Sequence, residues 1–227
     1  MTTASDDLSS ADAPPDSKLT ATKQRWAREG RFLTGRHARP EAERLPPGQH
    51  LVRDWPVLDL GMTPEIGADR WRLALLGAVE NPVQWTFEAF KAEPQVSTLS
   101  DIHCVTSWSR YDNRFEGVST RHIIEVVRPK DDVRFVILTS YDGYTTNLPI
   151  EDFAADDALV AHSWEGRPLT TEHGGPVRLV VPHLYFWKSA KWLKRIEFAT
   201  ADRPGFWEQR GYHNHGDPWQ EQRYSSD

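Results

Sequence analysis

Proline and tryptophan are the residues that most restrict how this chain can fold. The 227 residues include 16 prolines and ten tryptophans. Proline lacks a backbone N–H and fixes φ, so it interrupts helices and is confined to turns, strand ends and sheet edges. Tryptophan buries a large ring wherever it enters a core. The sequence therefore predicts a loop-rich body held together by aromatic side chains rather than a helical bundle.

Short strands and short helices follow one another irregularly along the chain. Ser119 is typical of the cap of a helix that runs to Val127, and Thr86 is typical of the cap of a helix that stops before Pro94. β-Branched and aromatic residues at 133–139 predict a strand. Further strands are expected at 57–60, 71–79, 101–108, 144–148, 158–164, 177–182 and 195–199, and a helical turn at 188–193. This irregular order predicts an α+β fold rather than a doubly wound parallel sheet.

The length fits one large domain with peripheral segments. Residues 1–20 are small, polar and acidic, and they are expected to form a disordered tail because they lack the apolar area that offsets ordering entropy. The remaining divisions are an extended arm at 21–44, a main body at 45–200 and a C-terminal arm at 201–227.

The charge of the chain excludes several partners. The formal net charge is -6, so no broad cationic surface is expected, and neither nucleic acid nor a membrane is predicted as a partner. No run of 18 apolar residues occurs, and the first thirty residues contain no apolar signal-like stretch. A cytoplasmic location is expected.

Cys104 is the only cysteine, so an internal disulfide is impossible. Its thiol can pack in the core, act as a nucleophile or bind a metal. The neighbouring His103 does not make a Cys–His pair, because adjacent residues of a strand point to opposite faces. A thiol hydrolase would therefore need another base, for which His122, His162 and His183 are candidates.

Two segments have the residue types of a phosphate site. Residues 173–178 combine paired glycines with His173 and Arg178, and residues 188–191 offer two lysines, a hydroxyl and backbone N–H groups. Polar residues at 139–144 directly follow the most apolar strand, where functional side chains often collect. The His and Asp residues at 213–217 are of the types that bind metals. No distant set of ligands with a fixed spacing completes a metal site with them.

Five segments together resemble, in the same order, the molybdopterin-binding domain of the sulfite oxidase family. The segments are 103–108, 144–149, 165–169, 173–182 and 188–193. The likeness covers residues 45–200, and the residues around 211–219 are similar to the small stand-alone bacterial branch, which includes relatives of the periplasmic methionine sulfoxide reductase catalytic subunit. The resemblance implies a mixed-sheet fold with short helices and long extended arms.

The resemblance also implies a site for a molybdenum–molybdopterin cofactor, a pyranopterin dithiolene, without haem. Cys104 matches the cysteine that ligates the metal, a role that suits a soft thiolate. Tyr144 falls near the tyrosine of the sulfite-oxidising members, so both side chains are expected to be catalytic. The residues that match cofactor-contacting positions are Arg53, Thr139, His173, Arg178, Ser189, Ala190 and Lys191.

The chain departs from the family pattern next to Arg53. Asp54 and Trp55 stand where sulfite oxidases have Asn and His, which alters charge and hydrogen bonding beside the pterin. No haem domain and no immunoglobulin-like dimerisation domain accompany the likeness, so a monomer is expected.

The resemblance implies a molybdenum-dependent oxidoreductase that transfers an oxygen atom to or from a small sulfur- or nitrogen-containing substrate. An electron-transfer partner is required, and the sequence does not name it. The alternative is a non-catalytic molybdopterin-binding or interaction protein. An anionic substrate would need cations around the metal, and a neutral substrate would need apolar walls. The candidates are Arg53, Arg110 and Arg114 for the cations and Trp108, Tyr144 and Trp187 for the walls.

Overall fold

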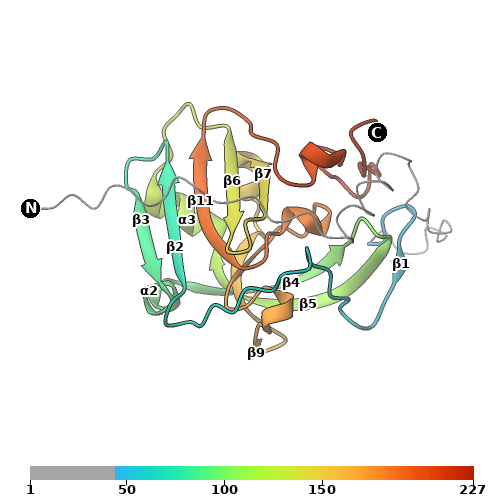
Figure 1. Cartoon of the computed structure of the whole chain (residues 1–227), viewed down its shortest axis with the longest axis horizontal. Helices are drawn as coiled ribbons and strands as arrows, with labels where there is room; N and C mark the ends of the chain where they lie inside the picture. Colours follow the sequence, from blue (N-terminus) through green and yellow to red (C-terminus); the bar gives the residue numbers. More distant parts are fainter. Residues whose placement is uncertain (1–43) are drawn as a thin grey trace, which may run out of the picture.

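The computed structural model describes residues 44–227, and two mixed β-sheets form its body. The tail expected at 1–20 and all but the last residue of the arm expected at 21–44 lie outside the described residues. Figure 1 shows the strands of one sheet standing side by side while the long hairpin of the other sheet runs across them. The α+β class with mixed sheets is confirmed.

The first sheet has five strands in the order β3 (Val83–Thr86), β2 (Arg72–Gly77), β11 (Leu193–Ala199), β6 (Phe135–Ser140) and β7 (Thr145–Pro149). β2 and β11 pair in parallel, and the other pairs are antiparallel. Alternate apolar side chains of these strands are buried, as expected for strands that cover a core with one face. They include Leu73, Leu75, Val136, Leu138, Ile196 and Phe198.

The second sheet is built on the long strand β5 (Trp108–Ser119). β5 pairs along its length with β4 (Gln95–His103), and on its other side with β1 (His50–Leu51) and β8 (Leu159–Trp164). β10 (Arg178–Val180) and β9 (Arg167–Pro168) pair with β8. The β4–β5 connection is a tight turn, and it carries Cys104.

Helices are short, as the prolines predict. α2 (Phe87–Ala92) begins at Thr86 and α3 (Thr120–Val127) begins at Ser119, and each cap hydroxyl accepts a hydrogen bond from the first turn, which confirms both caps. The other short helices are α4 (Ile150–Phe153) and the 3₁₀ turns η1 (Thr171–His173), η2 (Phe186–Lys188) and η3 (Glu208–Arg210). Within residues 44–227, no helix has the length and apolarity needed to cross a membrane.

Three local predictions were wrong. Residues 57–60 form an extended loop and not a strand. Pro56 and the residues after it pair with no neighbouring strand. β4 ends at His103, so Cys104 lies in the turn after the strand rather than inside it. The helical turn expected at 188–193 lies earlier, at Phe186–Lys188, since Leu193 already belongs to β11.

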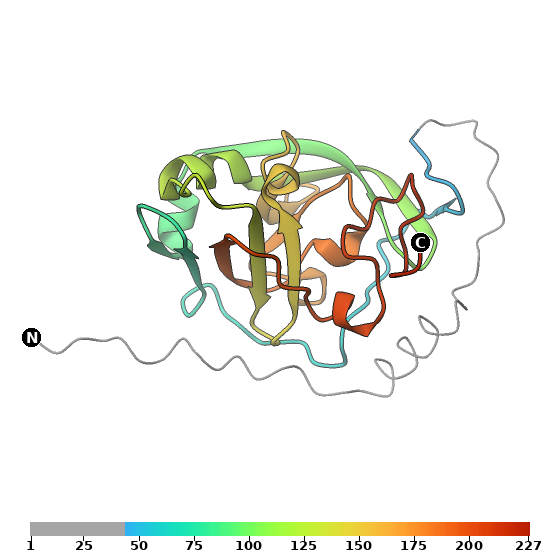
Figure 2. The same ribbon diagram turned by 90° about the horizontal axis from the view of Figure 1, so that it is seen from above.

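The C-terminal segment, residues 201–227, packs over the body near β1, as Figures 1 and 2 both show. Phe206, Trp207 and Tyr212 are buried in the main core. Arg223 donates hydrogen bonds to the carbonyls of Val105 and Pro47. The segment is therefore part of the body that surrounds the β4–β5 turn.

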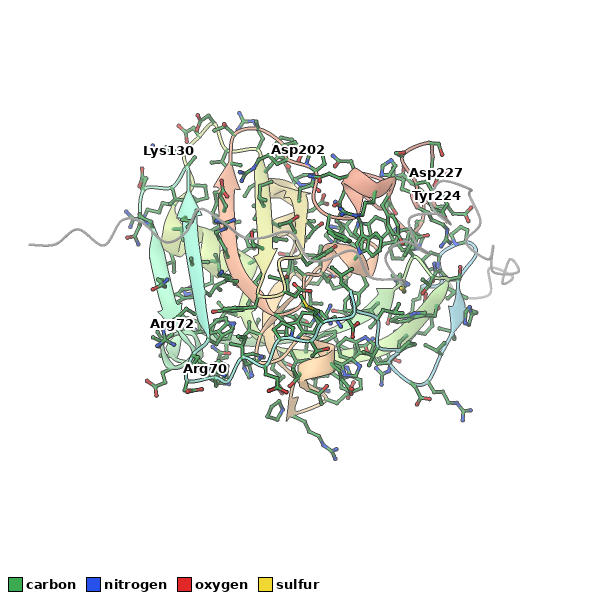
Figure 3. All side chains as sticks on the ribbon, viewed as in Figure 1. Arg70, Arg72, Lys130, Asp202, Tyr224 and Asp227 are labelled. Atoms are coloured by element: carbon green, nitrogen blue, oxygen red, sulfur yellow. The ribbon has the colours of Figure 1, made fainter. Side chains whose placement is uncertain are left out.

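Asp202, labelled in Figure 3, fixes the start of this segment. Its two carboxylate oxygens accept hydrogen bonds from the side-chain amides of Asn147 and Asn214, at 2.6 and 2.7 Å. Asn147 belongs to β7, so the bonds join the segment to the first sheet.

Gly117 is expected to be required for the pairing of β5 with β8. A Cβ at this position would overlap the carbonyl oxygen of Val160 and lie 2.7 Å from Cα of Ala161. Gly117→Ala should lower the free energy of unfolding by about 2 kcal/mol or more, measured by urea denaturation, because overpacked cores must shift backbone. Gly166→Ala meets no atom within 4 Å and should cost about 1 kcal/mol from its positive φ alone. Equal losses in the two variants would contradict this reason.

Candidate functional site

A cavity opens beside the β4–β5 turn, and the void inside it, its mouth included, is about 860 Å³. Its walls come from five parts of the chain that are distant in sequence: residues 55–60, 104–108, 140–144, 172–192 and the C-terminal segment. The aromatic side chains in these walls are Trp55, Trp108, Tyr144, Phe186, Trp187, Trp192, Trp207 and Tyr212.

Cys104 lies on the cavity wall, with 7% of its surface exposed. Its N–H donates to the Trp108 carbonyl and its own carbonyl accepts from Ser107 N–H, so the residue is held in a closed turn. The side-chain amide of Gln49 donates to the same carbonyl. The Sγ atom lies 3.1 Å from Oγ1 of Thr106. The thiol is therefore fixed in direction at the cavity, as a metal ligand must be.

The geometry does not support a cysteine hydrolase. His103 is buried away from the cavity, its Nδ1 bonds to Ser109, and burial lowers its pKa to about 4. His173 does line the cavity, but its ring nitrogens contact Oγ1 of Thr170 and the carbonyl of Trp55. The three other candidate bases are not among the cavity-lining residues: His122, His162 and His183.

Arg178 is a buried cation at the cavity wall, 2% exposed. Its guanidinium donates to three backbone carbonyls, those of His173, Leu179 and Ser189. Phe186 lies 4.3 Å beneath it. Burial lowers its pKa to about 9, so the group remains charged at neutral pH. Within residues 44–227 no carboxylate forms an ion pair with it, and a buried charge of this kind favours an anionic ligand.

Two further polar atoms of the cavity wall have no partner in the part of the chain that the structure describes. They are Nε1 of Trp108 and Oγ of Ser140, both buried. Buried polar groups are normally hydrogen-bonded, so each such atom at a cavity indicates a ligand with matching polar groups. With the Arg178 cation and the Cys104 thiol, they fit a polar, anionic cofactor that also brings a metal.

The segment at 188–191 contributes two of its three predicted residues. Ser189 lines the cavity and its Oγ accepts from Val181 N–H. Lys191 lines the cavity, donates to the Glu172 carbonyl and lies over the Trp192 ring. Ala190 is buried behind the wall, where its carbonyl accepts from Leu179 N–H.

The paired glycines do not leave space for a ligand. A Cβ on Gly174 would meet the Lys191 side chain at 2.9 Å, and a Cβ on Gly175 would overlap the Leu169 carbonyl. The glycines instead allow the loop at 173–178 to pack tightly, which brings His173 to the cavity. Trp55 stacks on His173 with ring centroids 4.2 Å apart.

Two predicted cofactor contacts are not among the cavity-lining residues. Arg53 is exposed, and its carbonyl accepts a hydrogen bond from Arg110. Thr139 is buried in β6, where its hydroxyl accepts from Arg195. Their roles stay predictions.

Tyr144 lines the cavity, but its hydroxyl donates to the Trp187 carbonyl at 2.6 Å. Burial first, and then the charge of Glu208, raise its pKa well above the ordinary value. The phenol therefore stays protonated across the physiological range.

Behind Trp187, a buried ion pair joins the C-terminal segment to the cavity wall. Lys188 Nζ lies 2.7 Å from Oε1 of Glu208, and both side chains are almost fully buried. The same carboxylate oxygen accepts from Trp187 Nε1 and from Thr146 Oγ1. Lys188 also donates to Asn147. Glu208 thus fixes the ring of Trp187 at the cavity.

Sequence reasoning missed several residues of the cavity wall, among them two aromatic residues and one buried carboxyl. Trp207 and Tyr212 come from the C-terminal segment, where only the high aromatic content signalled a buried role. Asp142 lies in the polar run at 139–144 that the sequence singled out, but an Asp followed by Gly predicts only a turn at this position. It is 8% exposed, and burial raises its pKa to about 6.

Side chains alone do not form a metal site in the described part of the chain. No three His, Cys, Asp or Glu residues of residues 44–227 are placed to hold a metal ion. His215 instead pairs with Asp152, which also binds His183. A metal bound by Cys104 would therefore take its other ligands from a cofactor, and the donors of the cavity fit this arrangement.

The comparisons with known proteins agree with this chemistry. Residues 60–207 match the family described as "Oxidoreductase molybdopterin binding domain". The chain belongs to this family. It is an enzyme family of molybdopterin-dependent oxidoreductases of the sulfite oxidase type, as the sequence resemblance predicted.

Several curated proteins are similar to this molybdopterin-binding oxidoreductase. The "Uncharacterized oxidoreductase YuiH" of Bacillus subtilis is 47% identical over 82% of this chain and 95% of its own length. The "Protein-methionine-sulfoxide reductase catalytic subunit MsrP" of Campylobacter jejuni is 26% identical over 66% of this chain, which spans about half of that protein, 56%. The sulfane dehydrogenase SoxCD of Paracoccus pantotrophus shares the fold, with a TM-score of 0.57 and 22% identity, over 61% of this chain and 40% of SoxCD.

Asp142→Asn should stabilise the protein at neutral pH. The folded-state pKa is raised from 3.8 to about 6, so the protonated carboxyl favours the folded state, and this contribution is present below pH 3.8 and lost as pH rises through 6. The variant should unfold with a free energy up to about 3 kcal/mol larger at pH 7.5, and the gain should shrink towards pH 4. Thermal unfolding at several pH values measures it, and a gain independent of pH would contradict the cause.

Proposed function

We propose that this oxidoreductase transfers an oxygen atom from a small, neutral, sulfur- or nitrogen-containing substrate such as a sulfoxide. The observation that supports a neutral substrate is the character of the cavity wall. Eight aromatic rings line it, and its acidic residues are Asp59, Asp142 and Glu172. An apolar wall suits a neutral sulfoxide, and the carboxylates would repel sulfite.

The cations of the cavity do not form an oxyanion site for the substrate. Arg178 and Lys191 line the wall, and both donate to backbone carbonyls. The three arginines considered from the sequence for an anion, Arg53, Arg110 and Arg114, are not among the lining residues. Arg110 lies instead over the Trp164 ring. The two lining cations are better suited to the cofactor than to the substrate.

The residues of the cavity would hold the molybdenum–molybdopterin cofactor by complementary chemistry. The Cys104 thiolate would ligate the metal, and Arg178, Lys191 and Trp108 Nε1 would bind the anionic and polar parts of the pterin. When bound, the cofactor supplies the two-electron redox chemistry and the oxygen-accepting site. The protein shields this site from bulk water with aromatic rings and supplies protons.

The name of the MsrP relative gives independent support for a sulfoxide, since that protein is called a protein-methionine-sulfoxide reductase. An electron-transfer partner is required, and its identity is open. The cytoplasmic location, the monomeric state and the absence of haem stay predictions.

Cys104→Ala should abolish molybdenum binding while the fold is retained. The thiolate is the protein's metal ligand in this proposal, and its side chain is small, so its removal leaves only a minor cavity. Protein made in a host that synthesises the cofactor should contain molybdenum, and the variant should contain less than about a tenth as much, by elemental analysis with circular dichroism as the fold check. Ser97→Ala, on the exposed part of β4, is the matched control. Full molybdenum in the alanine variant would refute the ligand role.

Anions should inhibit the reduction of a neutral sulfoxide only weakly. With a reduced viologen dye as electron donor, sulfate at constant ionic strength should change KM less than about twofold, because no free oxyanion site competes. An anion-binding active site would instead raise KM in proportion to sulfate. Protein that binds the cofactor but turns over neither sulfoxides, N-oxides nor oxyanions would favour the non-catalytic alternative.

A further inference from the structure

Asp142 is the buried carboxyl of the cavity. It lies in the turn between β6 and β7, and it lines the same cavity as Cys104. Its Oδ1 accepts the N–H of Tyr144 at 3.0 Å, which fixes the side chain. Its own backbone N–H is a second donor to the carboxylate. Within residues 44–227 no side chain donates to it, so the carboxylate keeps lone pairs for a molecule in the cavity.

Two charged side chains of the cavity act on this carboxyl. Asp59 opposes its ionisation and Lys191 favours it, and both line the same cavity. Asp59 lies on the loop at 55–60 and is partly exposed, and its own Oδ1 accepts from Gly61 N–H. A second, more exposed carboxylate thus lines the same cavity and acts on the buried one, as a proton supply needs.

We propose that Asp142 is a catalytic proton-transfer residue, which passes protons from the cavity mouth to the oxygen atom that leaves the substrate. This rests on the proposed function. In the reduction of a sulfoxide the S–O bond breaks, sulfur gains two electrons from an external donor, and the oxygen takes up two protons and leaves as water. Asp142 delivers these protons one at a time and is reprotonated from the side of Asp59.

Other groups of the cavity suit this role less well. The Tyr144 hydroxyl is bonded to the Trp187 carbonyl and loses its proton only far above neutral pH. His173 has its ring nitrogens on Thr170 and Trp55. Burial raises the pKa of Asp142 to about 6, near the pH at which a proton donor works best. Asp142 therefore combines access to the cavity with a suitable proton affinity.

The test is the pH profile of kcat/KM for sulfoxide reduction with a reduced viologen dye in the molybdenum-loaded protein. The wild type should lose activity as pH rises through 6, because the protonated acid disappears. Asp142→Asn should lack this limb and should lower kcat about 100-fold at pH 6, the loss typical of a missing general acid. Asp142→Glu keeps the carboxyl and should regain the limb and part of the rate. Asp156→Asn removes an exposed carboxylate outside the cavity lining and is the control.

A second readout does not depend on turnover. Carbon-13 NMR of the full chain should show a carboxyl resonance that titrates near pH 6 in the wild type and in Asp156→Asn, and it should be missing in Asp142→Asn. The absence of such a resonance in the wild type overturns the proposal, even where the asparagine variant fails to fold. If Asp142→Asn reduces sulfoxide with an unchanged pH profile, the proton-transfer role is overturned while the proposed function stands. A loaded protein that reduces no sulfoxide overturns the proposed function as well.

Discussion

The ion pair between Lys188 and Glu208 is the contact on which the shape of the site depends. Both side chains are almost completely buried, so each charge relies on the other, and removal of one partner would leave an uncompensated charge in the core. Glu208 belongs to the C-terminal segment and Lys188 to the loop after β10. Because Glu208 also binds the ring N–H of Trp187, the pair sets an aromatic wall of the cavity. The polar network behind the wall thus supports its apolar surface.

The cavity combines two kinds of chemistry. Arg178 and Lys191 donate to backbone carbonyls, and they match the anionic cofactor of the family. The same wall carries aromatic rings together with Asp142 and Asp59. A cofactor site needs fixed charge, and oxygen-atom transfer needs exclusion of water together with a controlled proton supply. The cations suit the first need, and the rings and carboxyls suit the second.

Much of the fold followed from local sequence signals. The caps at Thr86 and Ser119 were predicted because a hydroxyl before an apolar run satisfies the free N–H groups of a helix start. The strand predicted at 57–60 was wrong. Apolar residues after a proline indicate extended backbone, but they do not show whether a neighbouring strand is present to pair with it. Six of the nine predicted site residues line the cavity, which forms only where distant chain segments meet: Cys104, Tyr144, His173, Arg178, Ser189 and Lys191.

The sequence by itself determined the thiol, the basic segments and their order, and these were sufficient to indicate the family, since ligand chemistry is a property of residue types. Only the tertiary structure decided which groups face the cavity. The raised pKa of Asp142, the walls formed by Trp207 and Tyr212, and the position of Arg53 outside the cavity lining follow from burial and from contacts between residues far apart in the chain. Such contacts depend on the packing of the whole molecule, so no local pattern of residues encodes them.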